Sequence, residues 1–437
     1  MKLLLFFMLV LALLSCSEFK PEDWSNVLGE AGSSSVGGDF SSEAEISSSS
    51  VFSSSSFTQS GQDLSSSNMP EESSSSANGS GSSSSAENAS SSSSVTDNSS
   101  SSAVTSSSSS SARSSSSVPV SSSACAGPVD CYGKLKTNGK NIVSSKTNQL
   151  VQIRGVSLSG VLDFYNKTVV QAMAEDWKAE VIRVTTHTYN NNIVPPEPIV
   201  TQVIDEAISR GIYVIITWAP EKTGDINVDA AKTFFAPMVK KYGREDHVIF
   251  EILDGSLNNN WMNIKNYANE VISYIRAGSD NLILVGTSHS NQGVYEVINN
   301  KITAYENVAY VLQFTADVTP DMIAPPDWSR PFRVVIEQVL QNNIPIFVSE
   351  YITATIMGTK VHNATNTDKW LEYLDSKGIS HIAGHIKDQR GSSTDNTAFF
   401  GNIASLTLDY LKNSDNMTES GKYVFNKLNE QANKAPW

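Results

Sequence analysis

Two carboxylates follow apolar, β-branched runs of the chain, and these are the residues best suited to chemistry. Asp254 comes directly after the run 248–253, and Glu350 comes directly after the run 346–349. Carboxylates that face a common substrate can divide acid–base and nucleophilic work between them. Arg183 lies inside a third apolar run.

Other catalytic chemistries find little support. The chain has three cysteines, Cys16, Cys125 and Cys131, and the last two lie where the globular part begins, so thiol catalysis inside that part is excluded. In an oxidising compartment we expect Cys125 and Cys131 to form a local disulfide. No Ser-His-Asp arrangement is recognisable, and His187 has no partner at metal-ligand spacing. We therefore expect neither a metal nor a cofactor.

Charge and composition divide the 437 residues into two parts. Residues 1–123 carry 12 acidic and 3 basic side chains, whereas residues 124–437 carry 33 and 28, and the whole chain has a net charge of −14. No basic face follows from these totals, so nucleic acid is not expected as a partner. Serine fills 48 of the 91 positions from 33 to 123. Such a stretch has too little apolar surface to fold, which predicts a disordered tether.

The N-terminus has the features of an export signal. Lys2 precedes the apolar run 3–14, which is too short to span a bilayer stably, and the run leads to Cys16. The segment resembles a bacterial lipobox, which implies acylation of Cys16 and anchoring to a membrane; an ordinary signal peptide is the alternative. We expect a signal peptide at 1–15, a Ser-rich linker at 16–123, a globular domain at 124–437, and an exported monomer on the outer membrane or cell surface.

Apolar runs alternate with helical stretches throughout the globular part, which indicates a parallel sheet covered by helices. The expected strands are Val151–Val156, Val181–Thr185, Tyr213–Trp218, Val248–Leu253, Leu282–Gly286, Val308–Phe314, Ile346–Ser349 and His381–Ile386. The expected helices are Val169–Lys178, Ile199–Arg210, Asp229–Tyr242, Trp261–Ala277, Arg333–Gln341 and Asp368–Lys377, with a further helix at Ile403–Leu411. Eight such units fit an α/β fold of the closed (β/α)₈ TIM barrel type, with a hairpin around Asn138–Gly139 at its bottom. A doubly wound open sheet is the alternative.

The chain resembles glycoside hydrolase family 5, in its bacterial endoglucanase (cellulase) type. The matching segments are Val151–Leu158, Asp176–Trp177, Val181–Val184, Gly211–Ile216, Tyr242–Gly243, Val248–Ile252, Val285–Thr287 and Ile346–Glu350. The resemblance runs in order from about residue 134 to residue 388 and touches every expected strand. It implies a retaining mechanism, in which two glutamates about 5–5.5 Å apart act as acid/base and as nucleophile.

One of the two family glutamates is present here and the other is not. Glu350 matches the nucleophile after strand seven, and Arg183 matches its charge partner. In the Asn-Glu-Pro motif after strand four, Asp254 stands at the Asn, Gly255 at the Glu and Ser256 at the Pro. Glycine can neither give nor take a proton. Asp254 is the candidate substitute acid, although strand alternation turns it away from the face of residue 255 unless the strand bulges there.

Other positions that the family uses around the sugar have changed as well. Ser159 and Ala219 stand where the family has His, and Gly384 stands where it has Trp. The family's His-x-Tyr pair is replaced at 313–315. The side chains that we expect to bind substrate lie at the expected rim of the barrel: Trp218, Tyr189, Gln313 and Tyr351.

These residues lead to one functional hypothesis and two alternatives. We expect an exported, lipid-anchored, cellulase-like barrel that binds plant cell-wall β-glucan without efficient hydrolysis. The first alternative is an active retaining endo-β-1,4-glucanase with Glu350 as nucleophile and Asp254 as acid. The second is a structural envelope protein that retains only the fold.

Overall fold

The computed structural model describes residues 125–437 except 159–160, 190–191, 221–225, 256–258, 325–328, 357–359, 391–393 and 404, and the side chains of 188 and 189. The expected signal peptide, Cys16 and the Ser-rich tether lie outside the described residues.

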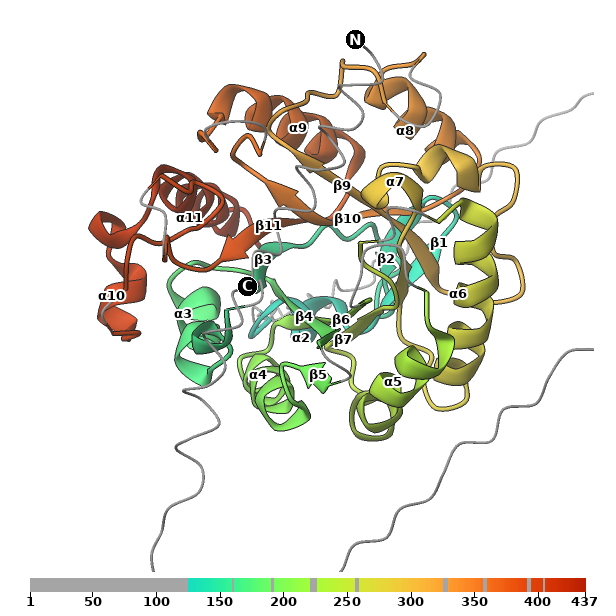
Figure 1. The fold of residues 1–437 in the computed structure, drawn as a ribbon, viewed down its shortest axis with the longest axis horizontal. Helices are drawn as coiled ribbons and strands as arrows, with labels where there is room; N and C mark the ends of the chain where they lie inside the picture. The colour runs from blue at the N-terminus through green and yellow to red at the C-terminus, as the bar shows by residue number, and fades with distance from the viewer. Residues whose placement is uncertain are drawn as a thin grey trace, which may run out of the picture. The chain divides into compact units, whose positions relative to one another are not determined.

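The described residues contain a closed barrel of parallel strands (Figure 1). Its strands are β3 (Arg154–Leu158), β4 (Val181–Tyr189), β6 (Tyr213–Ala219), β7 (Val248–Glu251), β8 (Ile283–Val285), β9 (Val308–Thr315), β10 (Ile346–Ile352) and β11 (His381–Ile386). Neighbours in the chain are neighbours in the sheet, and β3 pairs with both β11 and β4. This last pairing closes the sheet, so the fold is the expected (β/α)₈ barrel and not an open sheet.

Helices surround the barrel and follow most of its strands (Figure 1). They are α3 (Lys167–Glu175), α4 (Glu197–Ser209), α5 (Val228–Tyr242), α6 (Trp261–Arg276), α7 (Ser288–Asn291), α8 (Phe332–Gln341), α9 (Ala364–Lys377), α10 (Leu408–Lys412) and α11 (Glu419–Ala432). Asparagine side chains cap α3, α5, α6 and α9, each accepting a hydrogen bond from a backbone N–H of the first turn. Such caps satisfy groups that a helix start leaves unpaired.

The core has two layers because alternate residues of each strand face opposite sides of the sheet. In β6, Val214 and Ile216 pack in the large outer cluster with the helices, whereas Tyr213 and Ile215 belong to a separate cluster. The second cluster fills the barrel interior, and Leu135 of the N-terminal hairpin joins it. Apolar side chains therefore occupy the N-terminal half of the barrel and leave its C-terminal end to polar groups.

The N-terminal segment covers the bottom of the barrel. β1 (Leu135–Asn138) and β2 (Asn141–Ser144) form the expected antiparallel hairpin, and Gly139 takes the left-handed φ of 58° that its two-residue turn requires. Before the hairpin lies the short helix α2 (Pro128–Tyr132). Cys125 and Cys131 form a disulfide here, as the sequence predicts.

The C-terminal part differs from the sequence-based expectation. In place of a helix at 403–411, the chain forms the short α10 and then the longer α11, which the sequence analysis did not identify. The side chains that α11 buries include Ser420, Val424 and Leu428, so its apolar stripe is narrow. The short strand β5 (Asn192–Val194), which pairs antiparallel with the end of β4, was also not predicted.

Within the described ranges, every helix is too short or too polar to cross a lipid bilayer.

Candidate functional site

Arg183 lies at the centre of a carboxylate cluster at the C-terminal ends of the barrel strands. Its Nε is 2.6 Å from Oε2 of Glu251, its Nη2 is 2.8 Å from Oδ2 of Asp254, and its Nη1 is 3.1 Å from Oε2 of Glu350. The Arg183 side chain is only 1 % exposed, whereas Asp254 and Glu350 are each 17 % exposed. One guanidinium thus holds three acids, two of which solvent can reach.

Three strands bring these groups together. Arg183 is in β4, Glu251 is the last residue of β7, and Glu350 is in β10. The register of β10 against β9 shifts between Val348 and Glu350, which is a local bulge. A bulge interrupts the alternation of side chains, so Ser349 and Glu350 can both contribute to the cluster.

Glu350 is held as a charged carboxylate. Its Oε2 accepts a hydrogen bond from Arg183, and its Oε1 accepts one from Nε2 of His385 at 3.0 Å. Burial alone would raise the pKa of Glu350, but the charges of His385 and Arg183 outweigh it and lower that pKa far below its usual value. An ionised carboxylate is the form that a nucleophile requires.

Glu251 lies deeper and behaves differently. Its side chain is 0 % exposed, and burial raises the pKa of its carboxyl despite the charge of Arg183. Ser349 donates to its Oε1 and Thr217 donates to its Oε2, both at 2.6 Å. Glu251 is therefore a saturated internal group that supports Arg183.

Asp254 points into the cluster, although strand alternation predicted the opposite face. The reason is that β7 ends at Glu251, so the regular alternation has ceased before residue 254. Besides the ion pair with Arg183, Oδ1 of Asp254 accepts hydrogen bonds from Asn291 and from Gln313, each at 3.0 Å. One cation and two side-chain amides therefore already engage the Asp254 carboxylate.

Asn291 reaches Asp254 from a turn of unusual backbone conformation. His289, Ser290 and Asn291 have φ values of 53°, 55° and 62°, in the left-handed region that residues other than glycine rarely adopt. The Asn291 side chain is 0 % exposed, and its Oδ1 accepts the backbone N–H of Thr287 at 2.8 Å. Backbone strain of this kind is concentrated at functional sites.

Two glycines shape the site. Gly255, which the motif resemblance aligns with the family's acid/base glutamate, has a φ of 75°, a conformation that a residue other than glycine would rarely adopt. Gly384, which the resemblance aligns with a family Trp, lies against Glu350: a Cβ at 384 would be 3.1 Å from both Cγ and Cδ of Glu350. The backbone at 255 and the packing at 384 therefore both favour glycine.

The structure brings together only some of the residues expected from the sequence. Arg183, Asp254, Gln313 and Glu350 converge, and Gln313 also donates to Ser349 at 3.3 Å. His385 and Asn291 join them without having been predicted. The register between β11 and β3 shifts between Gly384 and Ile386, which is where His385 enters the cluster, and no sequence signal marks that bulge.

The expected aromatic platforms require correction. Trp218 is 2 % exposed and stacks on Phe234, and Tyr351 is 3 % exposed and stacks on Phe314. Both rings are used in the core, so neither presents an open face to a sugar. Tyr189 lies at the end of β4, where its backbone pairs with Asn192 of β5, and its side chain is outside the described residues.

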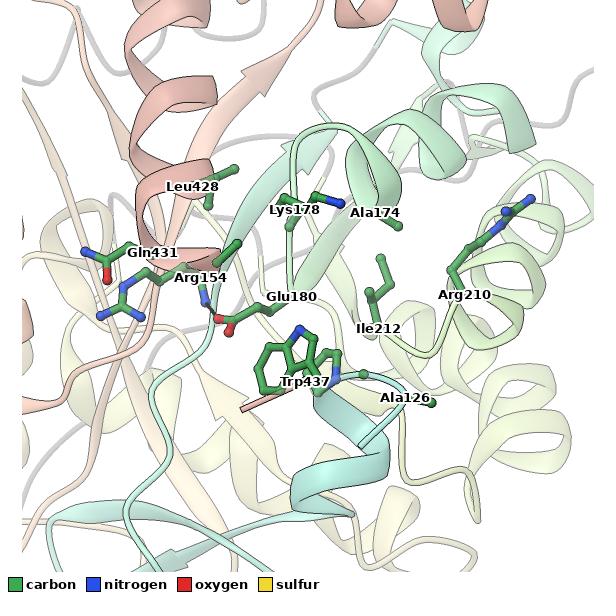
Figure 2. A pocket seen from close by; sticks show the side chains of 14 residues that line it. Ala126, Arg154, Ala174, Lys178, Glu180, Arg210, Ile212, Leu428, Gln431 and Trp437 are labelled. Carbon is green, nitrogen blue, oxygen red and sulfur yellow. Dashed lines mark hydrogen bonds between the residues drawn. The ribbon is translucent and has the colours of Figure 1, made fainter. Parts of the chain in front are cut away.

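A separate cavity of about 150 Å³ lies at the opposite end of the barrel (Figure 2). Arg154, Glu180 and Trp437 line it, close to the N-terminal ends of β3 and β4. Burial raises the pKa of Glu180 to about 7, and its Oε2 accepts the backbone N–H of Arg154 at 2.7 Å. Residues at this face of a (β/α)₈ barrel contribute to stability and not to chemistry.

In the described ranges, no group of three or more acidic, histidine or cysteine side chains is arranged so that it could hold a metal ion.

A (β/α)₈ barrel with carboxylates around a buried arginine at its C-terminal strand ends is an architecture of glycoside hydrolases. The family model "Cellulase (glycosyl hydrolase family 5)" matches residues 138–389, more than half of the chain. The chain therefore belongs to glycoside hydrolase family 5, in agreement with the resemblance seen in its motifs.

Known relatives are bacterial endoglucanases. Endoglucanase Z of Dickeya dadantii is 34 % identical over 269 residues, which cover 60 % of this chain and 57 % of the relative. Endoglucanase E-5 of Thermobifida fusca is 30 % identical over 278 residues, with coverages of 60 % and 57 %. The chain thus spans a little over half the length of these relatives.

Solved structures give the same result. A structure from Cytophaga hutchinsonii has a TM-score of 0.62 and 30 % identity, covering 70 % of this chain and 97 % of that one. The catalytic domain of Thermobifida fusca endoglucanase Cel5A has a TM-score of 0.59 and 28 % identity, with coverages of 69 % and 99 %. A variant of that domain in complex with cellotetraose has a TM-score of 0.59 and 27 % identity, with the same coverages.

Proposed function

We propose that the chain is an exported, lipid-anchored member of the family that binds plant cell-wall β-glucan without efficient hydrolysis. Its relatives are named endoglucanases, and one similar structure holds cellotetraose. Asp254, Gln313 and Glu350 offer acceptors and donors at the barrel mouth, and these suit the hydroxyl groups of a sugar chain.

The observation that carries the proposal is the state of the acid/base position. Gly255 has no proton to give, and Asp254 beside it is already engaged by Arg183, Asn291 and Gln313. General acid catalysis contributes about 10²–10⁴-fold, and a sugar alkoxide is a poor leaving group without a proton. A barrel that lacks this contribution can hold a glucan but turns it over too slowly to digest a polymer.

Binding and hydrolysis are measured on the same protein. We expect the purified chain to sediment with insoluble cellulose while it releases no reducing ends from carboxymethyl cellulose. Gln313→Ala should weaken sedimentation because it removes a polar contact of the site. Gln171→Ala is the matched control: Gln171 lies on α3 and donates a hydrogen bond to Glu175 at 3.0 Å. Failure of the wild-type protein to bind any β-glucan, or endoglucanase-speed hydrolysis, would refute the proposal.

One observation favours a second candidate, an active endo-β-1,4-glucanase with Asp254 as acid. Asp254 and Glu350 bind the two terminal nitrogens of the same guanidinium, so the two acids lie on one side of Arg183. This candidate predicts hydrolysis of carboxymethyl cellulose that is lost in both Asp254→Asn and Glu350→Gln. Absence of hydrolysis in the wild-type protein rejects it.

The membrane anchor is a separate part of the proposal. It rests on Cys16 at the end of the apolar run 3–14 and on the Ser-rich segment that follows. We expect the expressed full-length chain to fractionate with bacterial membranes and to incorporate labelled palmitate. Cys16→Ser should release it, whereas Cys125→Ser should not. Membrane association that survives Cys16→Ser would contradict lipid anchoring at this residue.

A further inference from the structure

We propose that the cavity at the N-terminal end of the barrel binds one neutral pyranose ring, either as a free monosaccharide or as the end unit of a glucan chain (Figure 2). This inference rests on the proposed function for the type of ligand, a sugar of a β-glucan, but it places that ligand at a second site. The cavity and the barrel mouth lie at opposite ends of the strands, and their described residues do not overlap. The inference assigns binding, and no reaction, to this end of the barrel.

The walls of the cavity are fixed by backbone contacts. They come from residues 126–128, the start of β3, the connections that precede β4 and β6, and α11 with the residues after it. The backbone N–H of Glu180 donates to the carbonyl of Arg154, and its carbonyl accepts the N–H of Tyr213, both at 2.9 Å. The disulfide described above closes the loop that contains 126–128. These bonds hold the walls independently of a ligand, so binding requires little ordering of the chain.

The volume of the cavity limits the size of the ligand. The space is about 150 Å³, and an apolar cavity of about that size in another protein binds one benzene molecule. One six-membered ring therefore fits, whereas a second linked ring would have to lie outside. The ligand is accordingly a single sugar or the sugar at the end of a chain, and not an internal unit of an extended glucan.

Apolar side chains of the lining suit the faces of a sugar ring. Trp437 lines the cavity and keeps part of its surface open. Its contact with Tyr132 is edge-on, with ring centres 5.6 Å apart and an interplanar angle of 86°, so at most one face of the indole is covered. Ile212 and Leu428 add aliphatic surface to the lining. A pyranose carries C–H groups on its faces, and these pack on aromatic and aliphatic side chains.

Polar groups of the lining suit the hydroxyls at the edge of the ring. Oε2 of Glu180 accepts the backbone N–H of Arg154 at 2.7 Å, whereas Oε1 has no hydrogen bond within the described ranges. The exposed ammonium of Lys178 likewise has no partner in the described part of the chain. Gln431 contacts Asp375 through its amide nitrogen at 3.4 Å, which leaves its amide oxygen as an acceptor. A hydroxyl both donates and accepts, so each of these side chains can bind one.

The charges around the cavity favour a neutral ligand over an ion. The two arginines of the lining are paired, Arg154 with Asp375 at 3.0 Å and Arg210 with Glu206 at 2.7 Å. Burial raises the pKa of Glu180 to about 7, so near neutral pH this carboxyl is charged in only about half of the molecules. The lysine ammonium is exposed, so solvent screens its charge. An anion or an organic cation would gain little from such a lining, whereas an uncharged polyol can use all of its donors and acceptors.

The experiment follows the indole of Trp437 directly. The purified full-length chain is labelled with 5-fluorotryptophan, and the fluorine resonance of Trp437 is the one that Trp437→Phe removes. Glucose or cellobiose should shift this resonance saturably, with half-saturation on the order of 1–10 mM for so small a ligand. A response to glucose alone identifies a free monosaccharide as the ligand, and a response to cellobiose as well identifies a chain end. No response to either sugar would overturn the inference.

Two lysine variants provide the matched comparison. Lys178→Ala removes a donor from the cavity wall and should raise the half-saturating sugar concentration at least about 3-fold. Lys240→Ala removes an exposed lysine of α5, away from the cavity, and should leave that concentration unchanged. Equal values for the two variants would overturn the inference. Saturation of the Trp437 resonance by acetate or choline, and not by the sugars, would do so as well.

The inference and the proposed function fail in different ways. Gln313→Ala changes the barrel mouth and should leave the response of Trp437 intact; loss of that response would place the sugar at the mouth and overturn the inference. If the chain sediments with cellulose but Trp437 does not respond to sugar, the inference is wrong and the proposed function stands. If Trp437 responds but the chain sediments with no β-glucan, the proposed function is wrong and the cavity is still a sugar site.

Discussion

Asn291 donates a hydrogen bond from its Nδ2 to Oδ1 of Asp254 at 3.0 Å, and it does so from a left-handed backbone with φ 62°. Three successive residues of this turn, His289, Ser290 and Asn291, share the conformation. Each non-glycine residue held there costs about 1–2 kcal/mol. Backbone strain of this kind is expected at a functional site and not in a fold that is retained as a scaffold alone. The turn therefore favours a binding role for the cluster around Arg183 over a purely structural role for the protein.

The first prediction distinguishes the contribution of the Asn291 side chain to stability from that of its left-handed backbone. Asn291→Ala should lower the free energy of unfolding by about 1–3 kcal/mol, because Asp254 and the Thr287 N–H both lose a buried partner. Asn291→Gly loses the same contacts but adopts the left-handed backbone without strain, so it should be less destabilising than Asn291→Ala. Urea unfolding measures both variants. Equal losses would show that the backbone at 291 is not strained.

The second prediction concerns the arginine at the centre of the cluster. Arg183→Met should lower the free energy of unfolding by about 3–5 kcal/mol, because it leaves buried Glu251 beside Asp254 and Glu350 without a compensating cation. Arg333→Met is the control: its ion pair with Asp321 is largely exposed, so it should cost far less stability than Arg183→Met. Similar values for the two variants would mean that the cluster contributes nothing to stability.

The third prediction concerns the position that the motif resemblance aligns with the family's acid/base glutamate. Gly255→Glu should leave hydrolysis of carboxymethyl cellulose at background, because a φ of 75° strains a glutamate and does not direct its side chain as a regular strand end would. The same variant should lose about 1–2 kcal/mol of unfolding free energy. Reducing-end release and urea unfolding measure the two effects. Recovery of rapid hydrolysis would show that the site lacks only a side chain.

The fourth prediction concerns pH and the cavity at the other end of the barrel. Burial raises the pKa of Glu180 from 4.5 to about 7, so between these two pH values the folded chain keeps a proton that the unfolded chain has released. The contribution of this group to stability is complete below pH 4.5 and is lost as the pH rises to about 7, by roughly 3 kcal/mol.

Glu180→Gln removes this titration, so its unfolding free energy should fall less steeply than that of the wild-type protein across this range. Glu337→Gln, on the exposed side of α8, should follow the wild-type curve. Denaturant unfolding at several pH values provides the comparison. Parallel curves for Glu180→Gln and wild type would contradict the assignment.

The barrel could be predicted because its strands are nearly continuous apolar runs. The expected strands at 213–218, 308–314 and 381–386 lie within one residue of β6, β9 and β11. The first strand was placed too early: Val151 and Ile153 are buried but lie before the regular ladder, and β3 begins at Arg154. Val151 and Ile153 are apolar, as strand residues are, but their side chains are buried where they close the bottom of the barrel. Hydrophobicity alone therefore placed the start of the strand too early.

The sequence pointed to part of this cluster. Glu350 was singled out by its place after an apolar run and by the family resemblance, the resemblance added Arg183, and Asp254 was singled out by its place beside Gly255. His385 and Asn291 could not be found, because a bulge and a left-handed turn direct them into the cluster. Trp218 and Tyr351 were misjudged because an aromatic residue at a strand end can either bind a sugar or cap the core. Both cap the core here, since Trp218 stacks on Phe234 and Tyr351 stacks on Phe314.

Gly384 makes the present arrangement difficult to reverse. A Cβ at this position would sit 3.1 Å from the Glu350 carboxyl carbon and 2.9 Å from Cδ1 of Ile352, so even an alanine would have to displace its neighbours. An indole at 384 fits only if Glu350 leaves its present place, and with it the contact to His385. A large ring at this position therefore demands concerted changes on more than one strand.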